Sequence, residues 1–304
     1  MGDIDVQDYL RRQRDRVDAA IAQWLPPDNT PPESIHKAMR YAVLGGGKRL
    51  RPILAIAAAE SCGVETEPWM QQFAALELIH TYSLVHDDLP ALDDDELRRG
   101  RKTVHVVFGE ALAILTGDAL LTEAMSWLSK PARGVPADRQ LRGLAVVASA
   151  VDSQGMIGGQ VADLESERMQ ERTSDRKLLA GTLSFIHENK TGALITGAVM
   201  LGGILAGAHE SVLRELERYG RAVGLAFQIV DDLLDIEESA ATLGKTAGKD
   251  VAQGKLTYPA LFGVEEARNR AAALLEEAVG SADTIGGPVN YLGPIARYII
   301  ERRS

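Results

Sequence analysis

The stretch WMQQFAALELIHTYSLVHDDLPALD, residues 69–93, runs from an apolar segment into a cluster of carboxylates. Its apolar side chains recur with helical spacing on more than one face over 69–88, which predicts a helix in the protein interior. Pro90 cannot continue that helix, so we expect it to end near Asp88 or Leu89. The carboxylates then gather at a helix C-terminus, where the helix dipole disfavours negative charge and a bound cation would stabilise them.

Helical spacing continues along nearly the whole chain, and the alternating pattern of strands is missing. Ala and Leu dominate, while aromatic residues make up only 5%. We therefore predict one all-α domain over residues 1–304, with breaker-rich loops such as GSADTIGGP at 280–288. The predicted helices span 6–24, 33–44, 51–61, 69–88, 108–129, 139–154, 157–168, 176–188, 191–206, 211–237, 258–279 and 289–301.

A second acidic motif, DDLLD at 231–235, follows the apolar segment GLAFQIV. Asp231 and Asp235 are four residues apart and share one helix face, so they can bind one metal or its waters. Most acidic runs are solvated surface, but the apolar flanks of both motifs argue against that interpretation here. Converging carboxylates predict Mg²⁺, which prefers hard oxygen ligands and commonly binds together with phosphate.

Basic residues lie next to both acidic motifs and in a glycine-rich segment, where they are suited to bind phosphate. Taken singly, each would be assigned to the solvated surface. A nucleotide-binding P-loop is excluded, because LGKT at 243–246 has Ser239 where the motif requires glycine. The basic groups are Lys48 and Arg51 in GGGKRLRP, Arg98 and Arg99 in RRGRKTVH, and Lys245 and Lys249 in GKTAGKD.

The net charge of −10 and the pI near 5.2 disfavour a nucleic-acid partner. Neither a signal peptide nor an uninterrupted apolar run of membrane-spanning length is evident, which predicts a cytoplasmic protein without membrane insertion. The single Cys62 excludes an intrachain disulfide. Segment 238–256 is rich in Gly, Ala and Lys and lacks an apolar period, so we interpret it as a lid over a phosphate site.

With these residues in view, the chain resembles the trans-isoprenyl diphosphate synthases, most closely the bacterial farnesyl diphosphate synthases. The likeness extends over nearly the whole sequence. It implies a bundle of antiparallel helices around a deep central cavity and a homodimer. The motifs that carry it are GGGKRLRP, ELIHTYSLVHDDLPALDDDELRRGRKTVH, GGQVAD, HENKTGAL, AFQIVDDLLD, GKTAGKD and GKLTYP.

The resemblance also implies a metal site. Asp87 and Asp93 of the first motif and Asp231 of the second would bind Mg²⁺ directly. Asp88 and Asp235 would assist, in part through water. The expected cofactor is a cluster of roughly three Mg²⁺ ions.

The allylic diphosphate would be held by Arg98, Lys190 and Lys245 together with the metal ions, again by resemblance. Thr191 and Gln228 would line the reacting centre. The allylic substrate would ionise, and the double bond of isopentenyl diphosphate would attack the resulting cation. The chain is therefore expected to be a prenyltransferase.

Isopentenyl diphosphate would occupy a site without metal, formed by Lys48, Arg51, His80 and Arg99. For His80 the residues give independent support. It precedes Asp87 by seven positions, within about 20° on the same helix face. A lone histidine on an apolar helix would otherwise be taken for a core residue.

The expected product is farnesyl diphosphate, because a bulky residue at Tyr82, five before Asp87, is similar to the bacterial farnesyl synthases. Periodicity alone would place Ser83 nearer in angle to Asp87, so Tyr82 as the floor of the chain-length cavity comes from the resemblance. The alternatives are a geranylgeranyl diphosphate synthase and a noncatalytic regulatory subunit of a synthase. A terpene cyclase is disfavoured by the intact DDLLD and GGGKRLRP motifs.

Overall fold

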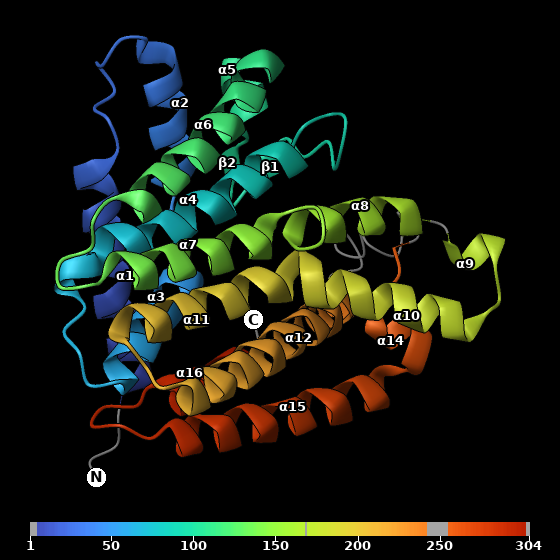
Figure 1. Ribbon diagram of the computed structural model, residues 1–304. Coiled ribbons are helices and arrows are strands. Elements are labelled where there is room, and N and C mark those ends of the chain that lie inside the picture. The colour runs from blue at the N-terminus through green and yellow to red at the C-terminus, as the bar shows by residue number, and fades with distance from the viewer. Residues whose placement is uncertain (1–4, 168, 242–254, 302–304) are drawn as a thin grey trace. The chain divides into compact units, whose positions relative to one another are not determined.

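The structure, a computed structural model, describes residues 5–167, 169–241 and 255–301 (Figure 1). Helices form most of it, so the predicted all-α class is confirmed. The chain groups into two compact units. We call residues 7–56 and 65–144 the N-terminal unit, and residues 57–64 and 145–301 the C-terminal unit. The prediction of a single domain over 1–304 stays a prediction.

The N-terminal unit is built around α4 (Met70–Asp87), most of whose residues are buried, as the apolar sequence predicts. Helix α6 packs along α4, and Gly117 permits this contact, because a Cβ there would lie 2.1 Å from Nε2 of His86. The other elements are α1 (Val6–Trp24), α2 (Glu33–Val43), the start of α3 (Leu50–Ser61), η1 (Glu67–Trp69), β1 (Leu97–Arg98), β2 (Arg101–Lys102), α5 (Val104–Phe108), α6 (Glu110–Ser129) and the start of α7 (Ala137–Val151).

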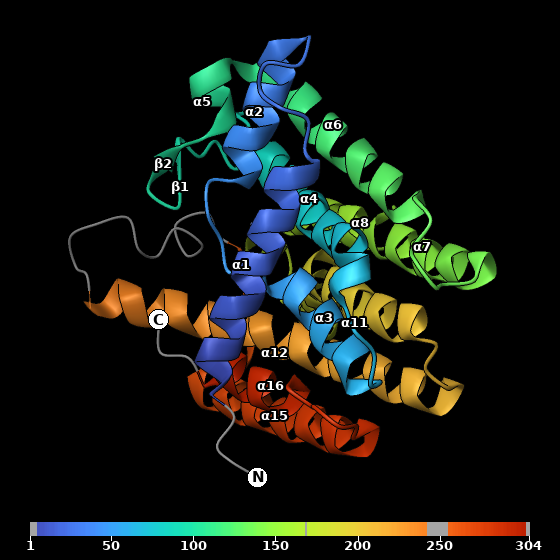
Figure 2. The same cartoon turned by 90° about the vertical axis from the view of Figure 1, so that its left-hand side faces the viewer.

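The C-terminal unit is organised around the long helix α12 (Glu210–Ala241), which packs against α11 and α15 (Figures 1 and 2). Helix α16 lies against both α12 and α15. The remaining elements are α8 (Met156–Ser166), α9 (Met169–Arg172), α10 (Arg176–Ile186), η2 (His187–Gly192), α11 (Ala193–Ala206), α14 (Tyr258–Phe262), α15 (Val264–Ile285) and α16 (Leu292–Ile300).

Between α10 and α11 the helix widens into the π-turn η2, which carries the HENKTG sequence. Helices α8 and α12 both approach the backbone of η2 closely, because each has a glycine at the contact. A Cβ on Gly159 would lie 2.2 Å from the Lys190 nitrogen, and one on Gly224 would lie 2.7 Å from Cα of Gly192. The absence of a side chain at these two glycines therefore allows α8 and α12 to pack directly against the backbone of the π-turn.

Several predicted boundaries are wrong for a local reason. The predicted helix 108–129 is divided at Gly109, and 258–279 is divided at Gly263, because both glycines have positive φ (86° and 92°). Helix α15 continues to Ile285, into the predicted loop 280–288. The expectation of no strands is corrected by a hairpin pairing Leu97 with Lys102, whose turn has positive φ at both Arg99 (54°) and Gly100 (73°).

Helix α6 is, among the described residues, the one helix long and apolar enough to pass a length-and-composition test for crossing a membrane. A single helix of this kind is weak evidence, because core helices of soluble proteins pass the same test. Its buried residues include Leu120, Ala124 and Trp127.

Candidate active site

The first acidic motif folds back on the end of α4. The helix ends at Asp87 with Asp88 as its C-cap, which confirms the predicted end point. The backbone N–H of Asp93 donates to the Asp87 carbonyl oxygen at 2.8 Å, and that of Asp95 donates to the Asp88 carbonyl oxygen at 3.2 Å. Asp94 has a φ of 51°, which completes the reversal. The backbones of Asp87 and Asp93, the two predicted metal ligands of this motif, are therefore directly joined.

The Asp88 carboxylate forms an ion pair with an arginine. Its buried Oδ1 accepts a hydrogen bond of 2.6 Å from Nε of Arg98, on the hairpin. Burial raises the pKa of the Asp88 carboxyl, while the Arg98 guanidinium opposes the shift. Arg98 also forms an ion pair of 3.5 Å with Asp95. This pairing ties the hairpin to the acidic motif and positions Arg98, the predicted ligand of the allylic diphosphate, at the end of α4.

Cationic groups converge on His80, about two helical turns before Asp87. Burial lowers the pKa of His80 well below its ordinary value, and the charges of Arg51, Arg99 and Arg98 lower it further. The pKa of Arg99 is also lowered, first by loss of solvation, although its residue surface is largely exposed. The structure thus brings together three of the four residues predicted to bind isopentenyl diphosphate. A neutral imidazole among guanidinium groups is suited to bind an anion.

The fourth, Lys48, is exposed in the glycine-rich loop before α3, and Arg51 lies in the first turn of α3. The hairpin contacts this loop, since an Arg99 guanidinium nitrogen donates to the Gly46 carbonyl oxygen. Tyr41, on α2 just before the loop, also bonds to the hairpin, because its hydroxyl donates to the Lys102 carbonyl oxygen at 2.7 Å. The hairpin is therefore bonded both to the glycine loop and to the end of α2.

Arg49 was missed by the sequence reasoning, although it stands between two predicted ligands. Its side chain is only 1% exposed and forms ion pairs with Glu77 (2.8 Å) and Asp18 (2.6 Å). It also donates to the Val43 carbonyl oxygen at 2.7 Å. Burial disfavours its charge, but Glu77 and Asp18 outweigh that effect and raise the pKa of Arg49. Arg49 anchors the loop that presents Lys48.

The C-terminal unit holds the other predicted residues on η2 and α12. Lys190 Nζ donates to Asp163 Oδ2 at 2.6 Å, so this predicted diphosphate ligand is paired with an aspartate of the GGQVAD segment. The Thr191 hydroxyl donates to Gln228 Oε1 at 2.9 Å, which unites the two residues predicted to line the reacting centre. The sequence did not assign a role to Asp163 either. The only sequence feature that pointed to it is the resemblance of the GGQVAD segment to the family motif.

The second acidic motif lies on α12. Asp231 and Asp235 are partly buried, whereas Asp232 between them is 5% exposed. Lys245 and most of the predicted lid at 238–256 lie outside the described residues; the helix itself continues to Ala241.

The donor set fits Mg²⁺ in kind, because both motifs offer only carboxylate oxygens. Among residues 5–167, 169–241 and 255–301, however, no three carboxylate, imidazole or thiol groups lie close enough together to hold a metal. The Mg²⁺ site therefore stays a prediction.

Tyr82 is 5% exposed, and its ring meets that of His86 edge to face at 5.9 Å. Its hydroxyl is buried without a hydrogen-bond partner among the described residues. Burial, with a smaller effect of the Asp87 charge, raises the pKa of Tyr82 to about 12. The ring therefore lies within reach of the Asp87 charge, and its role as the chain-length floor stays a prediction.

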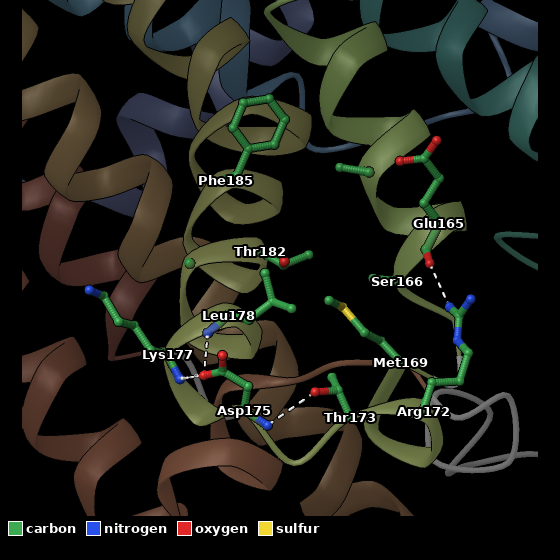
Figure 3. A pocket seen from close by; sticks show the side chains of 12 residues that line it. Glu165, Ser166, Met169, Arg172, Thr173, Asp175, Lys177, Leu178, Thr182 and Phe185 are labelled. Atoms are coloured by element: carbon green, nitrogen blue, oxygen red, sulfur yellow. Dashed lines mark hydrogen bonds between the residues drawn. The ribbon is translucent and has the colours of Figure 1, made fainter.

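A separate surface pocket of about 890 Å³ lies between α8 and α10 (Figure 3). Met169, Leu178 and Phe185 contribute apolar surface to it, and Asp175 caps α10 by accepting from the backbone N–H of Lys177 at 3.0 Å. None of the predicted site residues lines this pocket.

Comparison with known proteins identifies the family. A family model described as polyprenyl synthetase matches residues 32–290. The dimethylallyltranstransferase of Fischerella ambigua is 47% identical over 298 residues, covering 98% of this chain and 84% of that protein. The geranylgeranyl diphosphate synthase of Cyanophora paradoxa is 43% identical, covering 97% of this chain and 96% of that protein.

Among solved structures, the apo FPP/GFPP synthase from Zymomonas mobilis matches with a TM-score of 0.84 and 35% identity, covering 97% of this chain and 99% of that one. The geranylgeranyl pyrophosphate synthetase from the archaeon Geoglobus acetivorans matches with a TM-score of 0.83 and 30% identity, covering 98% of this chain and 99% of that one. These matches confirm the predicted isoprenoid synthase fold. The chain belongs to the polyprenyl synthetase family and is a trans-prenyl diphosphate synthase.

Proposed function

We propose that this protein condenses isopentenyl diphosphate with dimethylallyl and geranyl diphosphate and releases farnesyl diphosphate as its main product. The observation that carries the proposal is the group of arginines around the neutral His80, close to the first acidic motif. Such a group disfavours any further cation and favours an anion with several oxygens, such as a diphosphate. The relatives' names include both dimethylallyltranstransferase and geranylgeranyl diphosphate synthase, which supports the class of substrates.

Mg²⁺ would be held by Asp87 and Asp93 and by Asp231, with Asp88 and Asp235 assisting. When bound, the metal supplies Lewis-acid stabilisation of the charge that develops on the leaving diphosphate. Arg98, Lys190 and Lys245 would bind that diphosphate, and Lys48, Arg51, His80 and Arg99 would orient isopentenyl diphosphate for attack. The oxygen of Gln228, hydrogen bonded to Thr191, would face the developing cation.

Activity tests the proposal directly. The purified chain alone, given both substrates and Mg²⁺, should release diphosphate and should lose turnover in EDTA. A noncatalytic regulatory subunit would release none. Persistent activity in EDTA, or no release with any allylic substrate, would contradict the proposal.

Product length is tested at Tyr82, whose buried ring lies within the electrostatic reach of Asp87. The wild-type protein should form mainly farnesyl diphosphate, and Tyr82→Ala should shift the products to longer chains because the cavity floor is removed. Chromatography of the dephosphorylated products measures both. Geranylgeranyl diphosphate as the main wild-type product would favour the alternative synthase, and an unchanged pattern in active Tyr82→Ala would exclude Tyr82 as the floor.

We also propose a homodimer and a cytoplasmic location. Support for the dimer comes from large apolar side chains left exposed on neighbouring helices of the N-terminal unit, Val106 and Val107 on α5 and Ile114 and Leu115 on α6. Leu115 is 56% exposed, an unfavourable state that a second copy would relieve.

A further inference from the structure

A chain of hydrogen bonds runs through the buried carboxylate of Asp232, which none of the sequence assignments used. Gln228 Nε2 donates to Asp232 Oδ1 at 3.1 Å, and the backbone N–H of Tyr258 donates to Asp232 Oδ2 at 2.9 Å. His187 Nε2 lies 3.4 Å from the same Oδ2. The other end of the Gln228 amide, Oε1, accepts from the Thr191 hydroxyl at 2.9 Å.

The carboxylate of Asp232 determines which end of the Gln228 amide faces it. An ionised carboxylate can only accept hydrogen bonds, so the Gln228 group that faces Asp232 must be the NH₂. The amide oxygen then necessarily faces Thr191 on the π-turn. A side-chain amide has two orientations of nearly equal shape, and only its partners select one. Here Asp232 makes that selection.

We propose that Asp232 is a positioning residue that holds the Gln228 amide with its oxygen toward the reacting centre. The inference rests on the proposed function, in which Gln228 and Thr191 line the centre where a carbocation forms. The amide oxygen carries partial negative charge and stabilises a nearby cation, whereas the NH₂ group carries partial positive charge and opposes it. A reversed amide would therefore act against the reaction at the same position.

The three aspartates of DDLLD thus differ in task. Asp231 and Asp235 are partly exposed and are the proposed metal-side residues. Asp232 is 5% exposed, and both of its oxygens are engaged by protein groups from η2, α12 and the first residue of α14. The bond to Tyr258 also fixes the start of α14 against α12, so the same carboxylate orders the backbone at Tyr258 and the amide at Gln228.

The test exchanges amide and carboxylate between the two positions. In Asp232→Asn the new NH₂ group faces Gln228, so the Gln228 amide should turn and present its own NH₂ to Thr191. We expect kcat to fall by about tenfold to a hundredfold. The KM values of both diphosphates and the half-saturating Mg²⁺ concentration should stay within about twofold, because neither binding site is altered.

The double variant Asp232→Asn/Gln228→Glu restores the original polarity with the same atoms and the same net charge. The asparagine introduced at position 232 can donate to the glutamate introduced at position 228. That glutamate again presents an oxygen to Thr191. We expect the kcat of the double variant to exceed that of Asp232→Asn by at least about tenfold. The matched control is Asp231→Asn, which should raise the half-saturating Mg²⁺ concentration, as the loss of a metal ligand requires.

Three outcomes would overturn the proposal: full activity of Asp232→Asn, a raised Mg²⁺ requirement like that of Asp231→Asn, or a folded double variant without recovery. If Asp232→Asn alone does not fold, a double variant that folds and turns over supports the proposed orientation of the side chain at position 228, and a double variant that folds without turnover refutes it.

An NMR measurement is independent of turnover. The contact between the Gln228 amide protons and the Thr191 methyl should strengthen in Asp232→Asn, and unchanged contacts would refute the reversal. Inactive wild-type protein would instead contradict the proposed function, while this NMR contact would still decide the role of Asp232.

Discussion

Buried ion pairs determine much of the conformation of the glycine-rich loop before α3. Arg49 occupies an ordinary position in GGGKRLRP, yet its guanidinium is enclosed by Glu77, Asp18 and backbone carbonyl oxygens. Its φ of 52° is a backbone conformation that residues other than glycine rarely adopt. The buried ion pairs hold that conformation, and the loop presenting Lys48 depends on them.

Arg49→Met should therefore destabilise the protein strongly, because Glu77, with a side chain only 2% exposed, would be left as an unpaired buried charge. We expect a loss of about 3–5 kcal/mol in the free energy of unfolding, measured by urea denaturation. The matched control is Arg12→Met, which removes an exposed, solvent-screened ion pair with Asp8 and should change the stability far less. Similar losses in both variants would show that the Arg49 network does not stabilise the fold.

The lowered pKa of His80 predicts that the stability of the protein depends on pH. Its folded-state pKa is depressed, so between the ordinary value near 6.5 and the lower folded value only the unfolded chain takes up the proton. Stability should therefore fall as the pH is lowered below about 6.5, by up to about 1.4 kcal/mol per pH unit from this group.

The His80→Gln variant should lack this contribution, so its stability should change less between neutral and mildly acidic pH than that of the wild type. Denaturant titrations at a series of pH values measure the difference. Inorganic diphosphate should reduce the wild-type dependence, because an anion beside Arg51 and Arg99 favours the protonated imidazole. If the stability of the two proteins changed equally with pH, the lowered pKa of His80 would be contradicted.

Among the helices and turns, the π-turn η2 depends on glycines in the helices that flank it. Gly159→Ala would place a Cβ 2.2 Å from the Lys190 nitrogen and 2.6 Å from its Cα, which are backbone atoms that cannot turn aside. We expect a destabilisation of about 1–3 kcal/mol and a raised KM for the allylic diphosphate, because Lys190 is displaced.

Gly181→Ala on α10 is the matched control, since nothing lies within 4 Å of the added Cβ. It should stabilise the protein by about 0.5–1 kcal/mol through helix propensity. Thermal unfolding and initial-rate kinetics distinguish the two variants. If Gly159→Ala changed neither the stability nor the KM, the close contact between α8 and the π-turn would be contradicted.

For the complete protein, the apolar residues exposed on α6 predict self-association. The wild-type protein should sediment at twice the chain mass of 32.8 kDa. Leu115→Arg should shift it to the monomer, because a charge in an apolar interface is left without a partner. Tyr298→Arg, at a side chain 41% exposed on α16, should leave the mass unchanged. A monomeric wild type in analytical ultracentrifugation would refute the dimer.

Local sequence was enough to establish the all-α class, the end of α4 at Asp87 and Asp88, and the chemical character of both acidic motifs. These features can be predicted because apolar period and proline act over a few neighbouring residues. The sequence also pointed to Thr191 and Gln228 as neighbours of the reacting centre, but only through resemblance to a family.

The partner that each charged group takes depended instead on tertiary packing. Asp88 pairs with Arg98, Arg49 is buried with Glu77 and Asp18, and Asp232 turns the Gln228 amide. Arg49 and Glu77 are 28 positions apart, and their meeting depends on how helices pack, which periodicity does not encode. The π-turn likewise follows from packing, because it forms where Gly159 and Gly224 let two helices touch one backbone segment.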